Sequence, residues 1–202
     1  MPSSEDLHGN VPDESSTALL IIDTINDLEF EGGEQLLTTA LPAAEKIAQL
    51  KRRAKHSRIP VIYVNDNFGK WQSDFKKQVT HCLKDGVRGE PLARLLVPEE
   101  DDYFVLKPKH SGFYSTSLDI LLAYLKARTL ILTGLTGDMC VLFTAYDAYV
   151  RDFHLQVPAD CVASIDPEEN QLALRQMQRV LKADVRPSTE IDFHEAAHSS
   201  AS

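Results

Sequence analysis

Residues 130–145 of the chain read LILTGLTGDMCVLFTA, and this stretch decides the fold. It begins with a continuous apolar run that is typical of a buried β-strand, and beyond Gly137 its spacing becomes helical. The pattern predicts a strand over 130–133, a glycine-bearing turn and a helix over 138–151. Cys140 is therefore expected at the carboxyl end of a strand, where a helix begins.

A thiolate is favoured at that position. Unpaired backbone N–H groups and the positive end of the helix dipole both stabilise an anion, and the thiolate is the nucleophilic form of cysteine. The alternative is that Cys140 is a small buried apolar residue that fills the start of the helix.

Outward from this stretch, short apolar runs alternate with helical patterns. The predicted strands cover 18–22, 60–64, 103–106, 130–133, 154–158 and 183–185. The predicted helices cover 36–57, 117–126, 138–151 and 167–182, and the segment between the second and third strands is interpreted as irregular. Parallel strands need crossover connections, so this alternation predicts a doubly wound α/β fold with a mostly parallel sheet and helices on both faces.

Size and composition favour one domain. The chain has 202 residues, of which 43% are hydrophobic and 25% charged, as in an ordinary globular protein. We expect a single domain over 17–193, with small polar tails over 1–16 and 194–202 that are flexible.

Charge and hydropathy exclude some function classes. The net charge of −9 argues against a nucleic-acid partner, which requires positive charge along one face. No apolar run approaches the roughly 20 residues needed to cross a membrane, so no membrane partner is expected. The three cysteines Cys82, Cys140 and Cys161 lack paired spacing and follow no secretory signal, which predicts a cytoplasmic protein.

Three chemically useful residues follow predicted strands. Asp23 follows the first strand, Lys107 the third, and Cys140 lies one turn beyond the fourth. The carboxyl ends of parallel strands share one edge of a sheet, so a carboxylate, an ammonium and a thiol are expected to meet there. A thiolate attacks, a carboxylate carries its proton, and a lysine stabilises both anions. The alternatives are that Asp23 caps a turn and that Lys107 is a solvated charge; a Cys–His pair has weaker support, because no histidine directly follows these strands.

Three separated segments carry a family resemblance: DTINDL at 23–28, KPKHSGF at 107–113 and GLTGDMCVLFTAYDA at 134–148. With these motifs the chain resembles the isochorismatase-like cysteine hydrolase family, which includes nicotinamidases, N-carbamoylsarcosine amidohydrolases and ureidoacrylate amidohydrolases. The resemblance implies that Asp23 is the general acid and base, Lys107 its cationic partner and Cys140 the nucleophile. It also implies a cis peptide between Leu135 and Thr136 that turns the N–H groups of Thr136 and Cys140 toward an oxyanion.

The chain departs from the family pattern in its substrate-facing positions. Ile25 stands where the family has Gln, Leu28 where it has Phe, and Gly137 where Thr is common. Nicotinamidases carry an Asp-x-His and further histidines after the second strand, but here no histidine follows that strand until His81. We therefore predict no metal and no cofactor.

A substrate pocket is predicted from the residues around these motifs. The pocket residues proposed from the sequence are Asn65, Trp71, Tyr114 and Leu135. For Asn65 and its neighbours Asp66 and Asn67 the alternative is ordinary turn chemistry. For Phe113 and Phe143 core packing is favoured over a pocket role.

The leading interpretation is a cysteine hydrolase of a small amide or ureido substrate that acts through a thioester. One alternative is an isochorismatase-type vinyl-ether hydrolase, and another is a redox-active thiol protein or a non-catalytic binding protein. The expected partners are a small-molecule substrate and further copies of the chain. Residues 74–100 and the helix after Cys140 are candidates for the interface of that homo-oligomer.

Overall fold

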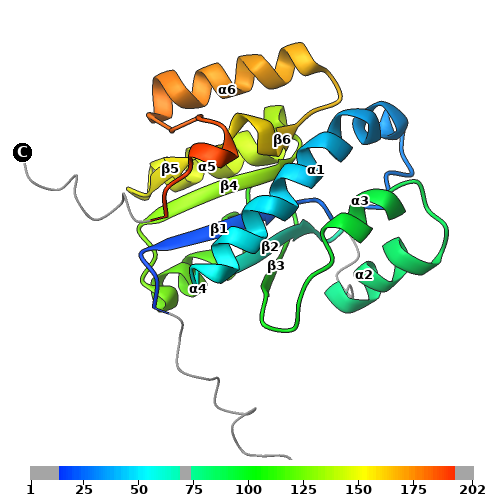
Figure 1. Ribbon diagram of the computed structural model, residues 1–202, viewed down its shortest axis with the longest axis horizontal. Coiled ribbons are helices and arrows are strands. Elements are labelled where there is room, and N and C mark those ends of the chain that lie inside the picture. The colour runs from blue at the N-terminus through cyan, green and yellow to red at the C-terminus, as the bar shows by residue number, and fades with distance from the viewer. Residues whose placement is uncertain (1–13, 69–73, 194–202) are drawn as a thin grey trace, which may run out of the picture.

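The continuous apolar runs pair as parallel strands in one six-stranded sheet (Figure 1). The computed structural model describes residues 14–68 and 74–193. The strand order is β3-β2-β1-β4-β5, and the short β6 pairs with β4. The strands are β1 (Thr17–Ile22), β2 (Val61–Asp66), β3 (Tyr103–Lys107), β4 (Thr129–Leu135), β5 (His154–Gln156) and β6 (Val162–Ala163).

Helices connect the strands and cover both faces of the sheet. They are α1 (Gly33–His56), α2 (Phe75–Lys84), α3 (Glu90–Leu95), α4 (Leu118–Leu125), α5 (Leu142–Tyr149) and α6 (Pro167–Leu181). A π-helical turn, Gly137–Val141, precedes α5, and 3-10 turns cover Ala159–Cys161 and Ser188–Glu190. The doubly wound α/β fold predicted from the sequence is confirmed.

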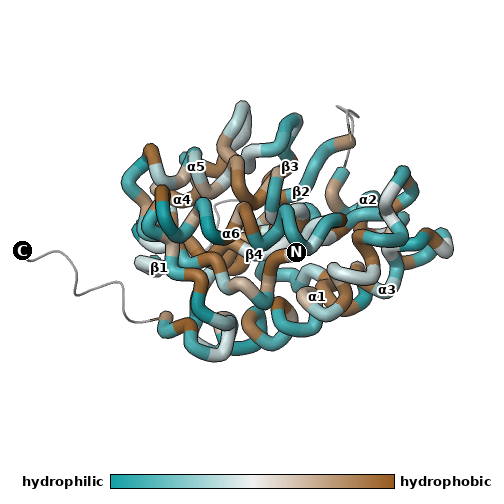
Figure 2. Tube along the Cα trace, turned by 90° about the horizontal axis from the view of Figure 1, so that it is seen from above, coloured by the Kyte–Doolittle hydropathy of each residue, from teal (hydrophilic) through white to brown (hydrophobic). Residues whose placement is uncertain are grey.

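The sheet separates two apolar layers. Leu19 and Ile21 of β1 pack with α1 and α3 on one face, while Leu20 and Ile22 pack with α4, α5 and α6 on the other. Burial on both faces explains why the strands are apolar without alternation. In Figure 2 hydrophobic positions concentrate toward the middle of the molecule, between helices with hydrophilic outer faces.

Two predicted elements differ from the structure. The segment interpreted as irregular contains α2 and α3, and Cys82 lies on α2 with 1% of its surface exposed. α2 carries apolar residues at helical spacing, Phe75, Val79, Cys82 and Leu83, so the sequence contained a signal for it that was missed. α3 has six residues, which is too short for a clear periodicity. The expected last strand over 183–185 is reduced to an isolated bridge between Gln156 and Asp184, so that prediction was wrong.

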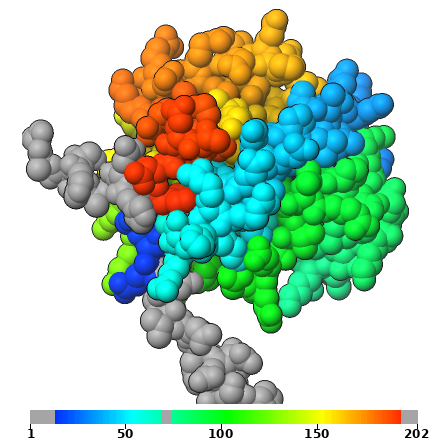
Figure 3. Space-filling model, in the orientation of Figure 1, coloured from blue at the N-terminus to red at the C-terminus, as the bar shows by residue number. Residues whose placement is uncertain are grey.

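The C-terminal segment is fastened to α1. The Arg53 guanidinium donates hydrogen bonds to the carbonyls of Ser188 and Ile191 over 2.6 and 2.8 Å. Figure 3 shows this segment, in red, packed against α1, in cyan. Within the described ranges, no helix has the length and apolar character needed to cross a membrane.

Candidate active site

The carboxyl ends of β1, β3 and β4 bring Asp23, Lys107 and Cys140 together. Asp23 directly follows β1 with a φ of 52°, Lys107 is the last residue of β3, and Cys140 lies in the π-helical turn after β4. β3 is separated from β1 by β2, so the length of the lysine side chain is needed to bridge the gap.

Lys107 lies at the centre of this group. Its Nζ is 2.8 Å from Asp23 Oδ2 and 3.5 Å from the Cys140 sulfur. The other Asp23 oxygen, Oδ1, accepts the backbone N–H of Asp66 at 2.7 Å, and the Asp66 carboxylate lies 3.6 Å from Lys107 Nζ. Lys107 is fully buried and Asp23 is 6% exposed, so these charges interact where water screens them little.

Burial and neighbouring charges set the protonation of the three groups. Burial raises the pKa of Asp23, although Lys107 and a hydrogen bond with Cys140 oppose the shift. Burial and the Asp23 carboxylate raise the pKa of Cys140 to about 12, against the opposing effect of Lys107. Burial alone lowers the pKa of Lys107, but Asp23, Cys140 and Asp66 together raise it above its ordinary value.

The resting sulfur is therefore a thiol. This differs from the expectation that the helix start favours a resting thiolate, because desolvation and the Asp23 charge raise the pKa of Cys140 by more than Lys107 lowers it. The same arrangement places a proton acceptor, the Asp23 carboxylate, in hydrogen-bond contact with the thiol. The chemistry that it allows is proton transfer from sulfur to carboxylate as the sulfur attacks.

The turn that carries Cys140 is shaped by β4, β6 and α6. The peptide between Leu135 and Thr136 is cis, and the Thr136 carbonyl accepts the N–H groups of Met139 and Val141, each at 3.1 Å. A Cβ atom on Gly137 would lie 2.1 Å from Asn170 Oδ1. Asn170 thus occupies the space that a side chain at 137 would need, which explains the glycine.

The loop after Lys107 is tied to the helix that follows Cys140. Ser111 donates a short hydrogen bond to Asp147, and the Gly112 N–H donates to Thr144 Oγ1 at 3.0 Å. The Thr144 hydroxyl in turn donates to the Cys140 carbonyl at 2.7 Å. These bonds hold the loop after Lys107, residues 108–113 (the lysine loop), and the π-helical turn Gly137–Val141 (the thiol turn) as one unit.

Sequence reasoning missed a histidine at this site. His110 lies three residues beyond Lys107, and its Nδ1 is 3.8 Å from the Cys140 sulfur. Its ring lies against Phe143, with the ring centroids 5.5 Å apart. His110 was missed because it does not directly follow β3, which ends at Lys107. Its position within the motif KPKHSGF at 107–113 is the sequence feature that could have indicated it.

The residues predicted to line a pocket are spread over different environments. Asn65 is fully buried and donates to the Ile25 carbonyl at 2.8 Å, and Leu135 is 2% exposed in the core. Both were predicted to line a substrate pocket. In the structure the Asn65 amide binds the loop after β1, and Leu135 belongs to the core layer that packs against α1. Tyr114 is 57% exposed, and Trp71 lies outside the described residues.

The described side chains at the end of β2 do not match a transition-metal site. They are the Asp66 carboxylate, which faces Lys107, and the Asn65 amide, whose N–H donates to the Ile25 carbonyl. Across residues 14–68 and 74–193, no group of three or more His, Cys, Asp or Glu side chains is arranged to hold a metal ion. The donor set is thus unlike the histidine-rich sites that transition metals prefer.

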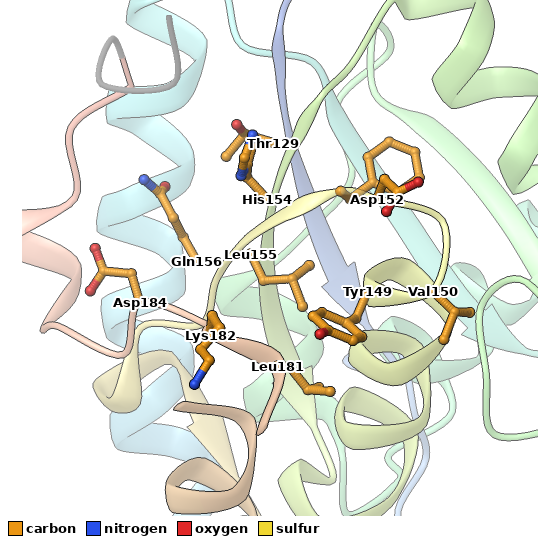
Figure 4. A pocket seen from close by; sticks show the side chains of 11 residues that line it. Thr129, Tyr149, Val150, Asp152, His154, Leu155, Gln156, Leu181, Lys182 and Asp184 are labelled. Carbon is orange, nitrogen blue, oxygen red and sulfur yellow. The ribbon is translucent and has the colours of Figure 1, made fainter. Parts of the chain in front are cut away.

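A surface cavity of about 630 Å³ lies away from this centre (Figure 4). Its lining includes Thr129 and His154, the first residues of β4 and β5, so it opens at the opposite end of the strands. Ligands of doubly wound sheets bind beyond the carboxyl ends, and the reactive groups described above lie there. We therefore place the candidate site at the reactive side chains Asp23, Lys107 and Cys140 and not at this cavity.

Comparison with known proteins agrees with the fold and with the motifs. The model of the isochorismatase domain matches residues 17–188. YaaI of Bacillus subtilis, an uncharacterized isochorismatase family protein, is 42% identical over 174 residues, which are 86% of this chain and 95% of YaaI.

Proteins named as amidohydrolases are also similar. The ureidoacrylate amidohydrolase RutB of Methylorubrum extorquens is 28% identical, over 77% of this chain and 73% of its own. The crystal structure of N-carbamoylsarcosine amidase from Thermoplasma acidophilum superposes with a TM-score of 0.67 at 30% identity, covering 88% of this chain and 99% of that one.

Proposed function

The chain belongs to the isochorismatase family, and from this membership we propose that it hydrolyses a small amide or ureido substrate at a C–N bond, with Cys140 as the nucleophile. The observation that carries the proposal is the contact of one buried ammonium, Lys107 Nζ, with both Asp23 and the Cys140 sulfur. Relatives named as amidases support the substrate class.

In the proposed acylation step, the Asp23 carboxylate takes the thiol proton while the sulfur attacks the carbonyl carbon. Lys107 stabilises the negative charge first on Asp23 and then on sulfur, so it remains paired throughout. Asp23 then delivers the proton to the departing amine, and a thioester forms on Cys140. A water molecule, deprotonated by Asp23, then attacks the thioester and releases the acid, and Asp23 returns the proton to the departing Cys140 sulfur, which restores the thiol.

The tetrahedral intermediates need hydrogen-bond donors for their oxyanion. We assign these to the backbone N–H groups of Thr136 and Cys140, which belong to the turn after β4. Donors fixed in a folded turn stabilise developing charge without reorganising, which is the source of oxyanion-hole catalysis.

A vinyl-ether hydrolase is the second candidate. Burial raises the pKa of Asp23, and a carboxyl group with a raised pKa is a proton donor that such a reaction requires. That reaction does not require the thiol, so Cys140 separates the two candidates.

The experiment compares Cys140→Ala and Cys140→Ser with the wild type on a panel of small amides, ureido acids and isochorismate. Loss of all amide turnover in a folded protein is expected, because a hydroxyl at this position lacks the acidity and nucleophilicity of the thiol. Cys82→Ala is the matched control, since it removes another thiol that lies on α2 and is buried in the core. Retention by Cys140→Ala of more than about a tenth of wild-type kcat/KM, a loss below ~1.4 kcal/mol, would contradict covalent catalysis.

We also propose that the protein acts in the cytoplasm as a homo-oligomer. The odd number of unpaired cysteines supports a reducing compartment. Sedimentation equilibrium of the purified chain tests the oligomer, and a strictly monomeric mass would contradict it.

A further inference from the structure

The Cys140 sulfur has polar neighbours on two sides. Asp23 and Lys107 approach it from the buried side, where they are 6% and 0% exposed. His110 is exposed and approaches with Nδ1 at 3.8 Å. The sulfur is thus held between a buried ion pair and a solvent-facing imidazole.

The number of protons on each group indicates which of them donate hydrogen bonds to the Cys140 sulfur and which accept. A thiol carries one proton, and the Asp23 carboxylate, which can only accept, is its hydrogen-bond partner. Lys107 can only donate, and it does so to the sulfur. With the single thiol proton directed at Asp23, the favourable arrangement for His110 is the tautomer whose Nδ1–H points at the sulfur.

The position of His110 is set by its neighbours in the chain. Lys107, three residues earlier, is anchored by Asp23, while Ser111 and Gly112 are bonded to Asp147 and Thr144 of α5. The ring itself rests against Phe143 on the same helix. A side chain fixed on both sides keeps its donor aimed at the sulfur at little cost in conformational entropy.

From this geometry we propose that His110 is a further catalytic residue, which donates its Nδ1–H to the Cys140 sulfur and stabilises the thiolate formed when Asp23 takes the thiol proton. The step moves one proton, from sulfur to the Asp23 carboxylate, and leaves the new negative charge between two donors, Lys107 and His110. The inference rests on the proposed function only in taking Cys140 as the reacting group.

Two substitutions separate the donor from the ring. His110→Asn places an amide N–H close to the position of Nδ1 but removes the ring and the ability to titrate. His110→Phe keeps the ring and its packing against Phe143 but removes the donor. His154→Phe is the matched control, because His154 is also exposed and lies at the opposite end of the sheet.

The measurement is the second-order rate of Cys140 alkylation by iodoacetamide at one fixed pH, followed by mass spectrometry of the Cys140 peptide. This readout requires no substrate. We expect His110→Phe to lower the rate by about ten- to a hundredfold, as for loss of one hydrogen bond to a charged group. His110→Asn should retain at least half of the wild-type rate, and His154→Phe all of it.

Three results would overturn the proposal. Unchanged rates in both His110 variants would show that the contact is incidental. A normal rate in His110→Phe with a slow His110→Asn would show that only ring packing matters. Equal losses in both would show that His110 acts as a base or a cation. If any of these occurred while Cys140→Ala remained inactive toward amides, the proposed function would stand without His110.

Discussion

At the scale of single residues, the protonation state of Cys140 decides what the site can do. A thiol pKa of about 12 leaves little thiolate at neutral pH, so the sulfur depends on a base at the moment of attack. In the proposed mechanism the Asp23 carboxylate is this base, and it is also one cause of the raised thiol pKa. The two effects of Asp23 can be separated by experiment.

We predict that Asp23→Asn abolishes turnover at every pH and yet shifts the pH profile of Cys140 alkylation to lower pH. The amide cannot accept the thiol proton, which stops catalysis. Its neutrality removes a charge that raises the thiol pKa, so the thiolate fraction below pH 10 should increase. Alkylation rates between pH 6 and 10 check the shift, with Asp27→Asn, at a partly exposed carboxylate after β1, as the control. An unchanged or lower alkylation rate across this pH range would contradict the assigned contact.

Activity is also expected to survive exhaustive treatment with a chelator. The reason is the set of donors at the end of β2, where the Asp66 carboxylate is paired with Lys107 and Asn65 offers only an amide, with no histidine beside them in the sequence. Turnover is measured before and after chelation, and with added divalent metal. A loss on chelation that metal restores would show that the end of β2 binds metal.

At the scale of the elements, the link between the lysine loop and α5 is the feature to test. Thr144 accepts the Gly112 N–H and donates to the Cys140 carbonyl, so one hydroxyl serves both elements. Thr144→Val leaves the buried Gly112 N–H without a partner, and we predict a loss of about 1–3 kcal/mol in the free energy of unfolding. We also predict a fall in kcat, because the loop and the thiol turn lose their common anchor.

The control for this variant is Thr38→Val. Thr38 makes the same kind of hydrogen bond, to the carbonyl four residues earlier, but on the exposed surface of α1. Its unfolding free energy, from urea denaturation, and its kcat should stay close to the wild type. Equal effects of the two substitutions would contradict a linking role for Thr144.

The sequence predicted the elements whose patterns are strong and missed those fixed by tertiary contacts. β1, β4 and α1 follow from apolar runs and helical spacing, and the strand ends at Asp23 and Lys107 follow from them. The helix α2 was missed although Phe75, Val79, Cys82 and Leu83 have helical spacing, because polar residues separate them in a segment without a strong apolar run. His110 was missed because the path of a loop depends on bonds such as that of Gly112 to Thr144, which no periodicity encodes. The hydrogen bond of Asn65 at the end of β2 likewise depends on Ile25, in the loop after β1.

At the scale of the whole molecule, a buried ion pair ties α1 to the segment before β3. Lys51 Nζ lies 2.6 Å from Asp102 Oδ2 and also bonds to the Val97 carbonyl and the Tyr63 hydroxyl. The Asp102 side chain is 1% exposed, and Lys55 is its second cationic partner. These ion pairs fix the position of residues 97–102, which lead into β3, the edge strand that ends in Lys107.

We predict that Lys51→Met lowers the free energy of unfolding by about 3 kcal/mol, because it leaves a buried carboxylate with one of its two cations. Lys77→Met, on the exposed surface of α2, should change it by less than about 0.5 kcal/mol. Urea denaturation of both variants gives the comparison. A loss below about 1 kcal/mol for Lys51→Met would show that Lys55 compensates fully. The wild-type kcat should persist wherever Lys51→Met is folded.

The order in which the reactive residues occur along the chain has a consequence for protein synthesis. Asp23 and Lys107 leave the ribosome before Cys140, and β4, which carries the thiol turn, is the strand that pairs with β1. Until β4 and the turn after it have been made, Lys107 and Asp23 have no Cys140 thiol beside them. If Cys140 is the nucleophile, as proposed, a translation product that ends before residue 140 cannot hydrolyse an amide.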